Sequence, residues 1–133
     1  MAEEIHNNGI VTIHIRDGIV FGNYLVEKVE LEDAVSATQF RKTITGNRAY
    51  PAYADLSGVK EVSREARSYF SNEAGEDLKA IALIIRNPVT RMMANFFMKF
   101  NQPGYPIRFF TNDKEAVNWL SQFVDAEALH DAK

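Results

Sequence analysis

Few residues of this chain have the types and spacing that chemistry at a protein site requires. The three histidines, His6, His14 and His130, include no His-x-x-x-His pair of the kind that binds zinc on a helix. The Gly-x-Ser-x-Gly motif and the common glycine-rich phosphate-binding motifs are missing from the sequence. Cysteine is also missing, which excludes disulfides and thiolate chemistry. We therefore expect no metal site, no cofactor and no enzymatic activity.

Serine, arginine and threonine residues gather where predicted strands end and helices begin. Ligands of parallel sheets favour the crevice beyond the carboxyl ends of the strands, and helix N-termini and arginines both supply donors to anions. The sequence therefore predicts a site for a small anionic ligand, such as a nucleotide, or for a partner at this rim. An alternative is that Ser63 only caps its helix and that the arginines are solvated or paired. The candidate residues are Ser57, Ser63, Arg64, Arg67, Asn87, Thr90 and Arg91.

A second candidate surface lies between Val89 and Phe100. Apolar residues recur there at helical spacing, and Ala94 and Met98 widen the apolar stripe beyond one face. One interpretation is a helix packed on the sheet. Another is an exposed contact for a protein partner or a second copy, since methionines adapt to varied surfaces; a third places a lipid-like molecule in a gap beneath the helix. The interface candidates are Met93, Phe97 and Met98.

The elements that must position these residues begin with a hairpin. Apolar and polar residues alternate over residues 10–15, which indicates a half-buried strand. Asp17-Gly18 follows and suits a tight turn, and residues 19–26 supply the return strand. The N-terminal part is therefore predicted to be antiparallel.

After the hairpin, helical and extended patterns alternate. We expect helices over residues 30–45, 63–72, 88–100 and 112–124, and strands over residues 50–56, 80–85 and 106–110. Strands separated by helices are usually parallel, with right-handed crossovers. The sequence therefore predicts an α/β fold with a single mixed, mostly parallel sheet of about five strands, an N-terminal antiparallel hairpin and four helices.

Length and composition agree with one small domain. The 133 residues are 46% hydrophobic, enough for a core, and no linker or repeat divides them. We expect one domain over residues 1–133, with an ordered core at about 9–126 and a polar C-terminal tail. A net charge of −3 argues against nucleic-acid binding. The longest apolar run, residues 80–85, is too short to insert into a membrane, and the expected location is cytoplasmic.

The element order and one motif resemble a known family. Ala54-Asp55-Leu56-Ser57-Gly58-Val59 closes a strand just before a helix and is similar to the signature of STAS domains, which include the bacterial anti-sigma-factor antagonists of the SpoIIAA type. Residues 18–22 and 91–97 resemble an uncharacterised bacterial branch of that family. In the antagonists, a serine in the segment opening the next helix accepts phosphate. That position falls on Arg64 here, so the resemblance implies the fold and not the phosphorylation switch of the antagonists. An alternative is that Ser63, at the start of the same helix, accepts phosphate instead.

These observations lead to two predictions of function. The first is a non-enzymatic regulatory module that binds a protein partner or itself, with a homodimer as one form. The second is a small-ligand binder, with an anion or nucleotide at the strand ends or a lipid-like molecule beneath the helix at residues 88–100. One scaffold supports many activities, so the fold alone does not choose between them.

Overall fold

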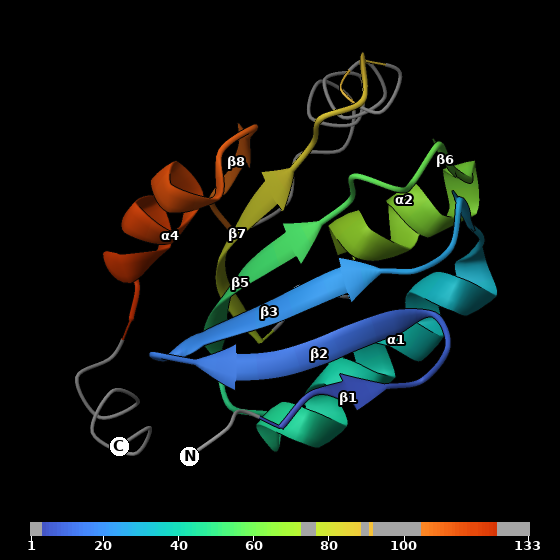
Figure 1. The fold of residues 1–133 in the computed structure, drawn as a ribbon. Helices are drawn as coiled ribbons and strands as arrows, with labels where there is room; N and C mark the ends of the chain where they lie inside the picture. The colour runs from blue at the N-terminus through green and yellow to red at the C-terminus, as the bar shows by residue number, and fades with distance from the viewer. Residues whose placement is uncertain (1–3, 73–76, 89–90, 92–104, 125–133) are drawn as a thin grey trace.

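The computed structural model describes residues 4–72, 77–88, 91 and 105–124, and its first part is an antiparallel hairpin (Figure 1). Strand β2 (Val11–Arg16) pairs with β3 (Ile19–Tyr24), and Ile13 lies opposite Gly22. Asp17 and Gly18 form the turn with φ of 53° and 78°, as the dipeptide predicts. A short strand that was not predicted, β1 (His6–Asn7), pairs with β2 and forms the sheet edge.

The hairpin is one side of a six-stranded sheet whose order is β1-β2-β3-β5-β7-β8. Strands β5 (Tyr50–Asp55), β7 (Leu78–Ile84) and β8 (Ile107–Phe110) run parallel to β3. Two further segments, β4 (Lys28–Val29) and β6 (Glu61–Val62), form a separate two-stranded parallel sheet. The predicted α/β class, the mixed sheet and the N-terminal hairpin are confirmed. The main sheet has six strands instead of five because β1 adds to its edge.

Helices cover the two faces of the sheet (Figure 1). Helices α1 (Leu31–Thr45) and α2 (Arg64–Asn72) contact each other on one face, and α4 (Asp113–Ser121) packs on β5, β7 and β8 on the other. The described residues contain these three helices. Most of the fourth predicted helix, residues 88–100, lies outside them.

Each of the three helices has the local signals expected from its sequence. A capping box between Glu30 and Asp33 starts α1, and Gly46 ends it in the left-handed conformation with φ of 64°. The Ser63 hydroxyl accepts a hydrogen bond of 3.1 Å from the Ala66 N–H at the start of α2. The Asn112 side chain accepts two such bonds at the start of α4. Local sequence therefore determines where the helices begin.

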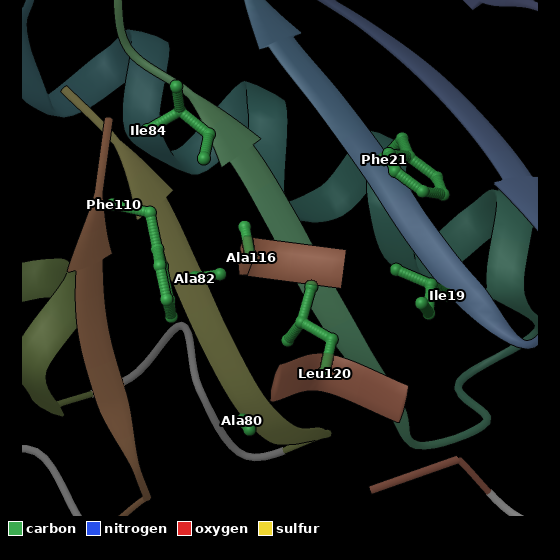
Figure 2. Close-up of a cluster of buried hydrophobic side chains, with 8 residues drawn as sticks. All are labelled: Ile19, Phe21, Ala80, Ala82, Ile84, Phe110, Ala116 and Leu120. Carbon is green, nitrogen blue, oxygen red and sulfur yellow. The ribbon is translucent and has the colours of Figure 1, made fainter. Parts of the chain in front are cut away.

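The face of the sheet beneath α4 is closely packed (Figure 2). Ala80, Ala82 and Ile84 project from β7 toward Ala116 and Leu120 of α4, and all five are fully buried. Small strand residues here allow the helix to approach closely. None of the helices in the described part of the chain is long and apolar enough to cross a membrane.

Candidate functional site

The opposite face of the sheet carries an apolar cavity that the packing of α1 and α2 leaves unfilled. Its floor includes small residues on the two central strands: Gly22 on β3 lies beside Ala54 on β5, and Ala52 lies two residues earlier on β5, beside Val20. Side chains that point to one face of a strand are two residues apart, so all three face the helices. The small size of these three residues leaves space between the sheet and the helices.

The walls of the cavity are aliphatic and aromatic. Its volume is about 140 Å³, close to the roughly 150 Å³ of an apolar protein cavity that holds one benzene molecule. That volume suits a single ring or a short alkyl group. The apolar wall residues include Val20, Ile81, Leu83 and Ile107 from the sheet and Ala37 and Phe70 from the helices.

Three polar side chains of the helices also line this cavity. Thr38 and Arg41 are one turn apart on α1, and Arg67 comes from α2. Thr38 is only 2% exposed, and its hydroxyl has no hydrogen-bond partner among the described residues. Buried hydroxyls are rarely left in this state, so the site offers a ligand or water a hydrogen-bonding position.

Arg41 is held by an ion pair at the edge of the cavity. Its Nη2 lies 2.6 Å from Oδ1 of Asp77, and both side chains are 12% exposed. Asp77 directly precedes β7, so the pair joins the end of α1 to the sheet. The bond fixes the position of the guanidinium and thereby of its positive charge.

Two tyrosines lie within the electrostatic influence of Arg41. Burial raises the pKa of Tyr24 from 10.0 to about 12, and the positive charge of Arg41 opposes this rise. Burial also raises the pKa of Tyr105, again against Arg41. The Tyr105 hydroxyl donates a hydrogen bond of 3.3 Å to the Phe70 carbonyl, linking the segment before β8 to α2. Both phenols therefore stay neutral at physiological pH.

A separate polar cluster occupies the carboxyl end of β5. Asp55 accepts a hydrogen bond of 2.9 Å from the Ser57 N–H, and Nη1 of Arg86 donates one of 2.8 Å to the Ser57 hydroxyl. The same Nη1 lies 3.9 Å from Asp55. Burial raises the pKa of Tyr53, and Asp55 and Asp113 raise it further. The Ser57 hydroxyl is thus engaged in closing the loop after β5.

The predicted site residues do not share one environment. Ser57 belongs to the cluster at the end of β5, and Ser63 caps its own helix. Arg67 lines the cavity, whereas Arg64 and Arg91 are exposed and Asn87 is partly buried. The structure therefore assigns Ser63 the capping role that the sequence left as an alternative. Thr90 and the interface candidates Met93, Phe97 and Met98 lie outside the described residues, so association through the latter stays a prediction.

Sequence reasoning missed most of the cavity residues. Thr38 and Arg41 gave a signal, because their spacing places these polar residues on the same face of α1 as Ala34 and Ala37. The alternation of small residues at Ala52 and Ala54 gave another. Neither pattern identifies a cavity until β3 and β5 are aligned. Within the described part of the chain, no group of three or more His, Cys, Asp or Glu could hold a metal ion.

Comparisons with known proteins agree with the fold. The family model for a domain of unknown function, DUF7793, matches residues 13–124. An uncharacterised protein of the DUF3478 family from Shewanella loihica PV-4, whose crystal structure has a SpoIIAA-like fold, superposes with a TM-score of 0.57 at 17% identity, over 90% of this chain and 92% of that chain. Among curated proteins, none matches this sequence. The SpoIIAA-like fold that the Asp-Leu-Ser-Gly segment and the element order implied is therefore confirmed.

Proposed function

This chain belongs to the DUF7793 family of domains of unknown function, and we propose that it is a non-enzymatic module that binds a small apolar molecule in the cavity beneath α1 and α2. The observation that carries the proposal is the cavity itself. It is a partly open apolar pocket of about 140 Å³ between the sheet and the helices, and well-formed apolar pockets with a few polar groups are few per protein.

The cavity has the composition of a ligand site. Such sites are concave and mostly apolar, with a few polar groups that fix orientation. The sheet supplies the apolar surface through Ala52, Ile81 and Ile107, and the helices supply Thr38, Arg41 and Arg67 as the polar groups. The volume favours a ligand whose buried part is one ring or a short alkyl group over one that buries a long acyl chain.

Binding without catalysis is the simpler use of this arrangement. A guanidinium group has hydrogen-bond donors and no acceptor, and burial raises the pKa of Tyr24 and Tyr105, so these tyrosines keep their protons. A general base needs a pKa near the working pH. The side chains named above therefore support recognition and supply no group suited to transferring a proton.

The proposal is tested by adding toluene, a neutral ring-sized probe, to protein with 13C-labelled methyl groups. Saturable NMR shifts are expected at Val20, Ile81 and Ile107, which line the cavity. The NMR signals of the methyl groups of Ile84 and Leu120, in the core beneath α4, are expected not to shift.

A matched pair of variants tests whether toluene binds in the cavity or elsewhere on the protein. Ala54→Leu places a larger side chain on the cavity floor and is expected to abolish the toluene shifts. Ala49→Leu adds the same atoms at an exposed position and is expected to preserve them. An absence of saturable shifts in the unmodified protein, or equal shifts in Ala54→Leu, would overturn the proposal.

A further inference from the structure

We infer that the ligand of this cavity carries an anionic group, a carboxylate attached to a ring-sized apolar body, which Thr38, Arg41 and Arg67 receive where the two helices meet. The inference rests on the proposed function and specifies the chemical class of its ligand. Three observations support it: the state of Thr38, the sign of the charges that line the cavity, and the electrostatic influence of Arg41.

The first observation is the buried hydroxyl of Thr38. Threonine within a helix often donates to the carbonyl of the preceding turn, which satisfies the hydroxyl locally. Thr38 makes no such bond, although its side chain is almost completely buried and lines the cavity. A carboxylate oxygen placed in the cavity accepts a hydrogen bond from this hydroxyl, whereas a purely apolar ligand leaves it unsatisfied.

The second observation is the sign of the charge. The charged side chains that line the cavity in the described part of the chain are two arginines, Arg41 and Arg67, and no carboxylate lines it. Asp77 pairs with Arg41 from outside the lining. Guanidinium groups bind planar carboxylates well, because their parallel N–H groups match the two oxygens. Among the described lining residues, a cationic ligand finds no partner of opposite charge.

The third observation is the field that Arg41 produces. Burial is the largest influence on the pKa of both Tyr24 and Tyr105, and Arg41 opposes it at each phenol. Arg41 thus favours negative charge at two points around the cavity. Arg41 itself lines the cavity, so a carboxylate placed beside its guanidinium there gains stabilisation of the same sign.

The ligand class is tested with three probes that share one phenyl ring and differ in charge: benzoate, toluene and benzylamine, each titrated against the methyl-labelled protein. Benzoate is expected to bind roughly tenfold more tightly than toluene, because charge-assisted hydrogen bonds add to the same apolar burial. Benzylammonium is expected not to bind. Benzoate and toluene of equal affinity would overturn the inference and leave the proposed function standing; if no probe binds, both fail.

Variants identify the groups that receive the carboxylate. Thr38→Val keeps the shape of the side chain and removes its hydroxyl, and Arg67→Gln removes one charge. Each is expected to weaken benzoate several-fold and to leave toluene unchanged. Arg64→Gln is the matched control on α2, because Arg64 is exposed and does not line the cavity. Equal effects of Thr38→Val and Arg67→Gln on benzoate and toluene would contradict the assignment.

Discussion

At the scale of single residues, the ion pair between Arg41 and Asp77 combines a structural and a binding role. It joins α1 to the start of β7 and holds a positive charge against an apolar cavity. The ion pair between Lys28 and Glu61, at 3.3 Å, is exposed to solvent, and such exposed pairs contribute little to stability. The difference in burial, rather than in distance, decides which pair matters to the fold.

Asp77→Asn is expected to destabilise the protein by about 3 kcal/mol, because it removes the charge of the carboxylate that pairs with the largely buried Arg41. Urea denaturation followed by circular dichroism measures the change. Glu61→Gln is the control, since it interrupts an exposed ion pair and is expected to leave the midpoint almost unchanged. Equal midpoints for the two variants would show that the buried pair contributes no more than the exposed one.

At the scale of elements, the two faces of the sheet use small residues in opposite ways. On β7, Ala80 and Ala82 let α4 pack closely against the strand. On β3 and β5, Gly22, Ala52 and Ala54 face helices that do not descend to fill the space. The same residue types therefore give a packed core on one face and a cavity on the other.

This asymmetry predicts opposite effects of one substitution. Ala82→Leu is expected to cost about 1–3 kcal/mol, because Ala82 is fully buried beneath α4 and has no space for three more carbon atoms. Ala54→Leu is expected to cost less or to stabilise the fold, because the new side chain enters the cavity. Thermal unfolding of the two variants compares them directly. A larger loss of stability for Ala54→Leu would mean that the space beneath α1 and α2 cannot accept a side chain.

Ser63 determines the start of α2. Its hydroxyl accepts the Ala66 N–H, so Ser63→Ala is expected to cost about 1 kcal/mol of stability. Ser63→Asp keeps an acceptor at that position and adds a negative charge that the helix N-terminus favours, so it is expected to retain full stability. Chemical denaturation of both variants gives the comparison. An equal loss in Ser63→Asp would argue against the capping role.

The sequence was sufficient to predict elements whose signals are local. The Asp17-Gly18 turn and the Ser63 cap each depend on a few neighbouring residues, and the structure confirms both. The cavity depends on a different kind of information. It arises because Gly22 and Ala54 lie side by side in neighbouring strands, a register that tertiary packing determines. For this reason, the sequence placed the candidate anion site at the strand ends. One of the arginines predicted for that site, Arg67, lines the cavity in the structure.

At the scale of the whole molecule, the distribution of tyrosines couples the fold to alkaline pH. Tyr24, Tyr53 and Tyr105 come from β3, β5 and the segment before β8, and burial is the largest cause of the raised pKa of each. A phenol whose pKa is higher in the folded than in the unfolded chain favours folding while it is protonated. The ionisation of these three side chains therefore limits how alkaline the solution can become before the fold loses stability.

The free energy of unfolding is expected to be constant up to about pH 10 with respect to Tyr24, and to fall between about pH 10 and 12. In that interval the unfolded chain loses the phenolic proton while the folded chain retains it, so rising pH favours unfolding. A shift from 10.0 to about 12 corresponds to a loss on the order of 2–3 kcal/mol. Urea midpoints at several pH values, with tyrosinate absorbance recorded in parallel, measure the fall. Tyr24→Phe has no proton to lose at this position and is expected to lose stability less steeply over the same interval; an equally steep fall in this variant would show that other groups cause it.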